Sequence, residues 1–564
     1  MSGLGRRDHA LEKLAATDGV DPLDLLVVGG GITGAGIALD AAARGMMVGL
    51  VERLDFGSGT SSKSSKLIHG GLRYLEQREF ALMREACTER DLLRRLAPHL
   101  VEAVPMALPV SDRKRRVQFG VGLWAYDALA SFKNMKIHRH LNGTETEALV
   151  PALPPGKVRG GFLFYDAKTD DVRLVMANLV EAVNYGAIVV NHAIVRDLTG
   201  GRRSCAAQIE DSLTGSVFDV RARRIVVAAG VWADRVEALA KEGSAPRLRP
   251  SKGIHLVFRR DAIDVGETAA FIPDIERRRM LFVIPWLGEV LVGTTDVDYA
   301  GPLDHPDVTA SERDYILDSL NAVFELDLDA DDVAGAYAGL RPLIQGKAGS
   351  TADLSRRHAV YDIAEGIVGI TGGKMTTYRR MAKDATDRVA SELGNSARSK
   401  TRWIKLGCAD LEGLRAAAAQ RLRTLGLDDS TGRHLIRAYG DRALDVLDIA
   451  AAEGLTAPLA PGYAPITAEA VYCARHEMAV HLNDLLARRT RLALLDRNAG
   501  IGESAHGADL MGREHGWRRS HRKLEVEAHR LEVERERGLA IAPPVVRRRG
   551  FPLNVSLRER RNTG

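Results

Sequence analysis

Three glycines in the spacing G-x-G-x-x-G, Gly29, Gly31 and Gly34, follow a short apolar run near the start of the chain. In a strand, turn and helix unit, the first glycine makes the turn, the second lets the backbone approach a pyrophosphate, and the third lets the helix pack on the sheet. Free N–H groups at the helix N-terminus would bind the phosphates. Glu52 ends the next apolar run, where an acid accepts hydrogen bonds from an adenosine ribose. Together these residues predict a bound dinucleotide; an ordinary glycine-rich turn is the alternative.

A second run, residues 57–76, is dense in Ser and Gly and carries several basic side chains. Because it follows Glu52 directly, it would lie beside the dinucleotide. Its backbone N–H groups and the hydroxyls of Thr60, Ser61 and Ser62 suit phosphate or the edge of a flavin ring. A flexible surface loop is the alternative, but the interspersed Leu and Ile residues favour packing.

Two further glycine-containing strand ends are expected near the same ligand. Residues 355–386 predict two strands, the pair Gly372 and Gly373, and a helix that begins near Met375. That helix N-terminus would offer a positive pole and free N–H groups to a flavin edge or a substrate anion. Gly230 ends another buried strand. A strand that ends in glycine would let the edge of the sheet lie against a dinucleotide.

Residues 248–295 alternate apolar and polar side chains, which predicts antiparallel strands. Such a sheet beside a βαβ unit commonly forms a substrate platform. His255 and Asp296 are its polar residues of interest. A satisfied sheet histidine and a simple strand-end cap are the alternative interpretations of these two.

The composition indicates a folded chain of two or three domains: 564 residues, 45% hydrophobic and 27% charged. A formal charge of +5 does not by itself imply nucleic acid, and no nucleic-acid partner is expected. Four widely spaced cysteines form no C-x-x-C pair, so neither a disulfide framework nor a metal site is expected. No signal-peptide core and no run of about 18 apolar residues is seen, so we expect no export by that route and no membrane span.

One segment nevertheless suits a membrane surface. Basic residues at 113–116 and 133–140 flank an apolar stretch that contains Trp124 and Tyr126. A basic and aromatic segment of this kind fits an anionic membrane surface. The alternative is a core helix with solvated ends.

With these features the chain resembles the FAD-dependent, quinone-linked glycerol-3-phosphate dehydrogenase family of bacteria and mitochondria. The resemblance covers about residues 20–500 and is carried by GGGITGAGIALDAAARG (29–45), TSSKSSKLIHGGLRYLE (60–76), GTTD (293–296), GLRPL (339–343), GGKMTTYR (372–379) and the later LARRTR segment.

The resemblance implies that sn-glycerol 3-phosphate is oxidised at C2 to dihydroxyacetone phosphate, that FAD takes the hydride, and that the electrons pass to a membrane quinone. It implies a substrate pocket formed by Arg73, Tyr74, His255, Arg341, Lys374 and Thr376. We assign Arg341 to the C2 oxygen, His255 as the base, and Lys374 with Arg73 to the phosphate. The expected cofactor residues are Gly29, Gly31, Gly34, Glu52, Thr60, Ser61, Ser62, Gly230, Asp296, Gly372 and Gly373.

Three other functions remain open from the residues alone. The first is an oxidase that passes the electrons to oxygen and releases peroxide. The second is a flavoenzyme similar to amino acid oxidases, which would give little reason for several phosphate-directed cations. The third is a non-catalytic FAD-binding protein. For Arg341, an ordinary strand-end ion pair is the alternative.

The fold class expected is α/β plus all-α: a Rossmann-like FAD-binding domain with an antiparallel-sheet substrate domain, and a C-terminal helical domain. The boundaries are 1–20 for an N-terminal extension, 21–395 for the FAD and substrate domains, 396–515 for the helical domain, and 516–564 for a charged, partly mobile tail. An apolar stripe at helical spacing predicts helical core at Val471, Ala474, Met478, Leu482, Leu485 and Leu486. We expect a homo-oligomer in the cytoplasm, bound peripherally to the inner face of the cell membrane.

Overall fold

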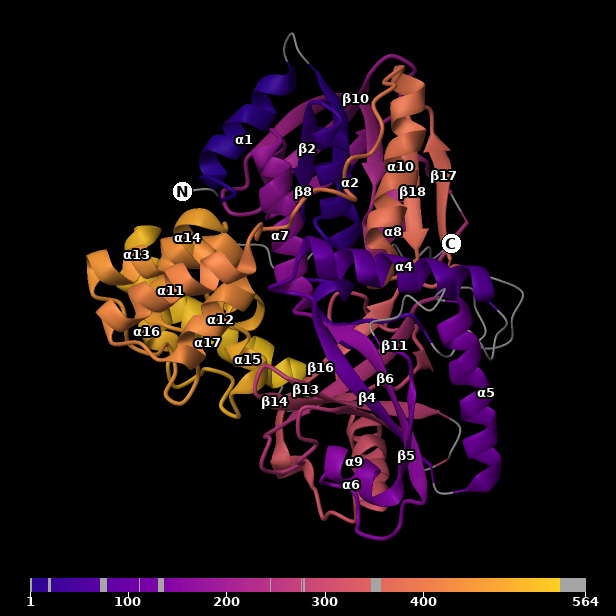
Figure 1. Cartoon of the computed structure of the whole chain (residues 1–564). Helices are drawn as coiled ribbons and strands as arrows, with labels where there is room; N and C mark the ends of the chain where they lie inside the picture. Colours follow the sequence, from indigo (N-terminus) through magenta and orange to yellow (C-terminus); the bar gives the residue numbers. More distant parts are fainter. Residues whose placement is uncertain are drawn as a thin grey trace, which may run out of the picture.

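A computed structural model describes residues 3–18, 22–71, 79–110, 112–129, 136–243, 245–274, 276, 279–345 and 357–537. Arg73 and Tyr74, both predicted to line the substrate pocket, lie outside the described residues. The described chain folds into two sheets with their covering helices and a separate group of C-terminal helices (Figure 1).

The first sheet is mostly parallel and contains the expected dinucleotide-binding unit. Its central strand buries Leu25, Leu26 and Val27 completely. Since neighbouring residues in a strand point to opposite faces, this sheet is covered on both sides, as parallel sheets are. The parallel strands are ordered β18 (Ile367–Gly372), β10 (Val217–Val227), β1 (Leu23–Val28), β2 (Val48–Val51) and β7 (Ile188–Val190), with antiparallel β17 (His358–Ala364), β9 (Cys205–Asp211) and β8 (Ala193–Thr199) alongside.

Helix α2 (Ile32–Ala43) starts at the glycine turn and packs against α7 (Asp171–Asn184) and α10 (Tyr378–Leu393). The contact with α10 is close, because a Cβ added at Gly36 would lie 3.0 Å from Ala382 Cβ. Small side chains therefore let α2 lie deep in the domain, with its N-terminus at the edge of the sheet.

The second sheet is antiparallel except where β12 pairs with β4. One of its faces is core: Ile254, Leu256 and Phe258 of β11 pack with apolar residues of α9 (Ala310–Phe324). Its strands are β3 (Leu67–Ile68), β4 (Glu102–Val110), β5 (Arg139–Asn142), β6 (Gly160–Lys168), β11 (Ser251–Phe258), β12 (Ala269–Pro273), β13 (Met280–Trp286), β14 (Glu289–Gly293), β15 (Val297–Asp298) and β16 (Val333–Arg341).

The C-terminal helices have a core of their own. Asp410 and Asp428 cap helix N-termini, while Gly426 and Gly454 end helices in the left-handed conformation. The helices are α11 (Leu411–Leu425), α12 (Asp429–Tyr439), α13 (Ala443–Glu453), α14 (Thr467–His476), α15 (Leu492–Leu495), α16 (Ser504–Glu514) and α17 (Arg519–Glu536).

The apolar stripe predicted in this domain is not one helix. Val471 and Leu485 are buried, but α14 ends at His476 and Met478 adopts a left-handed backbone conformation (φ 51°). Glu477 leaves the helix and accepts a hydrogen bond from Arg173 Nη1 at 2.8 Å. A buried ion pair to the first domain thus interrupts the helical period.

Helix α17 lies in the segment 516–564 that was expected to be a charged tail, and it is packed against the rest of the protein. Its buried residues are Glu525, His529 and Val533. Glu525 accepts a hydrogen bond from Leu482 N at 2.9 Å, and the helix end forms an ion pair between Glu536 and Lys63. A polar buried face has no apolar period, so the pattern of hydrophobic residues could not reveal this packing.

The remaining longer helices are α1 (Arg7–Ala15), α4 (Phe80–Leu96), α5 (Arg113–Leu129), α6 (Gly143–Leu149) and α8 (Ala233–Ala240). None of the helices in the described ranges combines the length and apolar character that crossing a bilayer requires.

Candidate functional site

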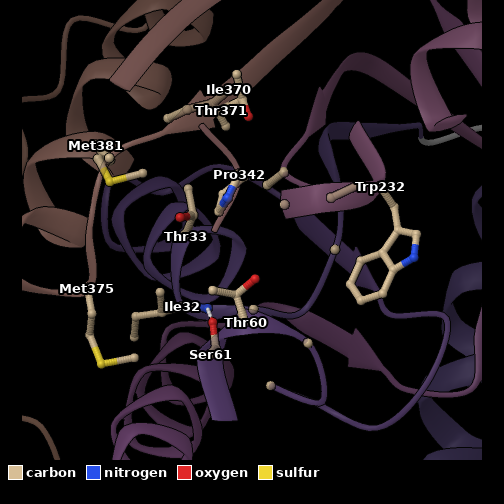
Figure 2. Close-up of a pocket in the computed structure, with 18 of the residues that line it drawn as sticks. Ile32, Thr33, Thr60, Ser61, Trp232, Pro342, Ile370, Thr371, Met375 and Met381 are labelled. Carbon is tan, nitrogen blue, oxygen red and sulfur yellow. Dashed lines mark hydrogen bonds between the residues drawn. The ribbon is translucent and has the colours of Figure 1, made fainter. Parts of the chain in front are cut away.

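A cleft of about 810 Å³, open mouth included, lies where strands β1, β2, β10 and β18 end (Figure 2). The carboxyl ends of parallel strands are where α/β sheets bind ligands. Gly29, Glu52 and Gly372 each line the cleft directly after or at the end of one of these strands. The glycine turn, the acid and the second glycine pair therefore meet at one site.

Most of the predicted cofactor residues line this cleft: Gly29, Gly31, Glu52, Thr60, Ser61, Gly230, Gly372 and Gly373. Gly34 lies against the turn, where an added Cβ would be 1.8 Å from Gly29 O. Ser62 supports the loop, since its hydroxyl donates to Ser58 O and Gly59 O. Asp296 is not among the residues that line the cleft.

The Glu52 carboxylate is held in place by the backbone. Its Oε2 accepts from Gly30 N at 2.7 Å, and its Oε1 accepts from Leu54 N at 2.9 Å. Burial raises the pKa of this carboxyl above its ordinary value. Carboxylate oxygens can accept more than one hydrogen bond, so Glu52 retains acceptor capacity for a ribose at the cleft wall.

The lining fits a dinucleotide with a flat ring system. The buried hydroxyl of Thr371 has no hydrogen-bond partner among the described residues. At Gly31 an added Cβ would meet only Ser61 Oγ, at 3.2 Å, so the backbone is open to a ligand there. The apolar surface comes from Ile32, Ile370, Met375, Met381 and Trp232 (Figure 2).

Arg341 and His255 lie on one face of the antiparallel sheet. Strand pairing sets Arg341 opposite Ser251 and His255 opposite Tyr337, and residues two apart in a strand share a face. Between them, Gly253 and Gly339 leave room for close neighbours: an added Cβ would lie 2.4 Å from Arg341 Nη2 at Gly253 and 2.3 Å from Lys63 O at Gly339. Pro342, the residue after Arg341, lines the cleft, so the end of β16 reaches the dinucleotide site.

The Arg341 guanidinium is fixed by neighbours on β11 and the turn after β14. Its Nη1 lies 3.2 Å from Asp296 Oδ1, and its Nη2 donates to Thr294 Oγ1 and Thr295 O at 3.1 Å each. Ser251 Oγ donates to the same Asp296 oxygen. Asp296, predicted to bind the cofactor, therefore orients Arg341 in this structure.

His255 is almost fully buried. Its Nε2 lies 2.8 Å from Ser65 Oγ, and its ring stacks on Tyr337 with centroids 5.0 Å apart. Its Nδ1 has no hydrogen-bond partner among the described residues. Burial, followed by the charges of Arg341 and Lys66, lowers the pKa of His255 well below its ordinary value. The imidazole is therefore neutral at pH 7, with one nitrogen engaged and one available.

The other predicted substrate residues divide between the cleft and the core. Lys374 lines the cleft. Thr376 is buried, and its Oγ1 accepts from His69 N at 3.2 Å. This bond ties the turn before α10 to the glycine-rich run of residues 57–76.

Sequence reasoning missed some residues of the site. Thr371 and Trp232 line the cleft, but neither belongs to a recognisable motif. Thr371 is a single threonine in an apolar run, and Trp232 follows a strand. Ser65 lies within the run that was singled out, yet its partner His255 is 190 positions away. Such pairing follows from strand register, which local patterns do not give.

Three buried side chains, Asp55, His192 and Asp484, come close enough together to suggest a cation site. However, Arg488 donates to both carboxylates and Arg489 donates to Asp55 at 2.8 and 2.9 Å. The two guanidinium groups balance the acidic charge, so this cluster is a contact between the C-terminal helices and the first domain.

Two family matches cover most of the chain. Residues 24–387 match the family described as FAD dependent oxidoreductase, and residues 399–522 match the C-terminal domain of alpha-glycerophosphate oxidase. The first match ends within α10, and the second begins before α11.

Named relatives match over nearly their whole length. The chain is 41% identical over 526 residues to glycerol-3-phosphate dehydrogenase 2 of Mycobacterium tuberculosis, covering 92% of this chain and 89% of that one. It is 36% identical over 492 residues to the aerobic glycerol-3-phosphate dehydrogenase of Bacillus subtilis, covering 84% and 88%.

Among solved structures, the fold matches the glycerol-3-phosphate dehydrogenase from Bacillus halodurans complexed with FAD, with a TM-score of 0.79 and 28% identity over 96% of this chain and 100% of that one. FAD is the cofactor of this family, and the lining of the cleft of β1, β2, β10 and β18, called the FAD cleft below, fits this group. By its domain matches, its relatives and its fold, the chain belongs to the family of FAD-dependent glycerol-3-phosphate dehydrogenases.

Proposed function

We propose that this protein oxidises sn-glycerol 3-phosphate at C2 to dihydroxyacetone phosphate and delivers the electrons to a membrane quinone. The observation that carries the proposal is the shared sheet face of Arg341 and His255 beside the FAD cleft, with Lys374 in the cleft wall. This arrangement joins fixed cations with a neutral imidazole, as oxidation of a phosphorylated secondary alcohol requires. The names of the relatives support the same substrate.

Each residue has a separate role in the proposal. Arg341, already oriented by Asp296, holds the C2 oxygen as it loses its proton. His255 accepts that proton at Nδ1, because Nε2 is engaged with Ser65. Lys374, together with Arg73, binds the phosphate. FAD, when bound, supplies the acceptor for the C2 hydride.

An exposed apolar stripe on α5 would fit a membrane surface and so supports a quinone as the acceptor. Val117, Val121 and Trp124 recur at helical spacing and are 65%, 68% and 57% exposed. Arg116 on the same helix is also exposed, and Leu123 and Tyr126 on the opposite side are buried. An exposed apolar stripe next to basic residues suits the headgroup region of an anionic bilayer. The alternative of a plain core helix does not explain this exposure.

Anaerobic mixing with glycerol 3-phosphate tests the reaction, and reoxidation tests the acceptor. We expect the flavin absorbance to bleach and then to recover on addition of a short-chain quinone faster than with air-saturated buffer. Recovery that is faster with oxygen and yields peroxide would make the protein an oxidase. If the flavin does not bleach, the protein binds FAD without catalysing this reaction.

A further inference from the structure

Arg491 of the C-terminal helical region is buried against the first domain. Its side chain donates to Asp170 Oδ1 at 2.6 Å and also to Asp171 Oδ1. Both aspartates stand at the start of α7, more than 300 positions earlier in the chain. Arg491 is 1% exposed; its Nε and Nη2 together engage Asp170, and the same Nη2 also donates to Asp171.

The other oxygen of Asp171 holds the glycine-rich loop at the FAD cleft. It accepts from Ser64 Oγ at 2.7 Å and from Lys66 Nζ at 2.6 Å. Lys66 is fully buried and has a left-handed backbone conformation (φ 57°). A residue in this conformation is strained, and the ion pair with Asp171 helps to hold it there.

The loop in turn holds His255. Ser65, between the two residues bound by Asp171, lies 2.8 Å from His255 Nε2. Tyr337 stacks on the other side of the imidazole and donates from its hydroxyl to Ser64 O at 2.7 Å. Lys66 Nζ lies 4.8 Å from the centre of the same Tyr337 ring. A continuous set of contacts therefore runs from Arg491 to the imidazole.

We propose that Arg491 is a positioning residue for the oxidation of the substrate, acting through Asp171 and the loop Ser64–Lys66 on the orientation of His255. This inference rests on the proposed function, in which His255 accepts the C2 proton. A lysine at position 491 keeps the charge but has a single terminal nitrogen, so it cannot keep the Nη2 bonds to both carboxylates and also replace the Nε bonds to Asp170 at 3.1 and 3.2 Å. The loop would then lose part of its support while the buried charge stays balanced.

Arg489 provides a matched control. It comes from the same segment, is fully buried, and donates to Asp55 at 2.8 and 2.9 Å. None of its contacts among the described residues is with Ser64, Ser65 or Lys66. If these arginines serve only to dock the C-terminal helices, Arg489→Lys and Arg491→Lys will have the same effect.

The test is anaerobic stopped-flow reduction of the FAD-loaded full chain at several glycerol 3-phosphate concentrations, with FAD content and melting temperature measured in parallel. We expect both lysine variants to melt lower than the wild type and to retain FAD. Only Arg491→Lys should lower the limiting rate of flavin reduction, by about tenfold, with the apparent Kd for substrate unchanged. Equal limiting rates in the two variants would overturn the proposal.

A double variant tests whether Arg491 acts through Ser65. Ser65→Ala alone should slow reduction, and adding Arg491→Lys should slow it by no more than about twofold further, because coupled residues are not additive. Effects that multiply would overturn the proposed route. If Arg491→Lys does not fold, Ser64→Ala tests the part of the route between Asp171 and the loop. It removes the bond to Asp171 and the bond from Lys66 N within the loop, and no charge. A slower limiting rate supports the proposal and an unchanged rate overturns it. A wild type that glycerol 3-phosphate does not reduce would instead refute the proposed function.

Discussion

The tightest geometric restriction beside the FAD cleft is at Gly34. A Cβ there would lie 1.8 Å from Gly29 O, and Cβ contacts in proteins stay beyond 3.0 Å, so the turn and α2 would have to separate by about 1.2 Å. The atom in the way is backbone, and a side-chain rotation cannot relieve the overlap. Gly34→Ala should therefore destabilise the protein by about 1–3 kcal/mol, as overpacking does.

The same displacement should weaken FAD binding. It moves the first N–H groups of α2 relative to the turn, and a hydrogen bond to a charged group contributes about 1.5–3 kcal/mol. Losing one such bond corresponds to about 10- to 100-fold weaker binding. Titration of the apo-protein with FAD, followed by quenching of flavin fluorescence, measures this change.

Gly36→Ala is the control on the same helix. Its added methyl would meet side-chain atoms of Ala382 and Tyr378 at 3.0 Å, away from the cleft. It should lower the melting temperature and leave the affinity for FAD unchanged. If Gly34→Ala binds FAD as tightly as the wild type, then the close contact between α2 and the glycine turn does not determine the affinity of the phosphate-binding site.

Three other results are expected. Arg341→Ala should keep FAD bound but reduce the limiting rate of flavin reduction by about 100-fold or more in anaerobic stopped-flow experiments; wild-type kinetics would refute its role. Because burial lowers the pKa of His255 well below 6.5, the imidazole stays neutral above that pH, and the limiting rate should be flat from pH 6.5 to about 8. A rate that halves near pH 6.5 would contradict this. Replacing Val121 and Trp124 by Ser should reduce sedimentation with anionic vesicles, and equal sedimentation would argue against a membrane surface on α5.

The residues around the FAD cleft could be predicted because each belongs to a short local unit. Gly29, Gly31 and Glu52 come from one strand, helix and strand unit, in which spacing along the chain sets spacing in space. Asp296 was expected at a strand end, but it lies in the turn between β14 and β15, and strand pairing determines its neighbours. The register of β11 and β16 brings Arg341 beside it, and a local pattern contains no register.

The contacts between the domains could not be predicted in the same way. The charges of Arg491 and Asp171 are visible in the sequence, but nothing in it pairs residues 320 positions apart. Helix α17 shows the same difficulty, since Glu525 and His529 are buried through polar contacts and give no hydrophobic period. Hydrophobic periodicity identifies surfaces that pack by apolar contact, and this interface adds buried ion pairs to the apolar contacts of Leu494 and Leu495.

An ionic interface of this kind has a consequence for function. Buried ion pairs contribute little net stability compared with apolar packing, but removing one partner is costly, and their geometry is narrow. Arg491, Asp171 and Lys66 therefore fix an orientation more than they add stability. Since Lys66 belongs to the loop that also carries Ser65, any loosening of the C-terminal helices should change the environment of His255 before FAD is released. Docking of the second domain and the geometry of the oxidation site are then one coupled property of the chain.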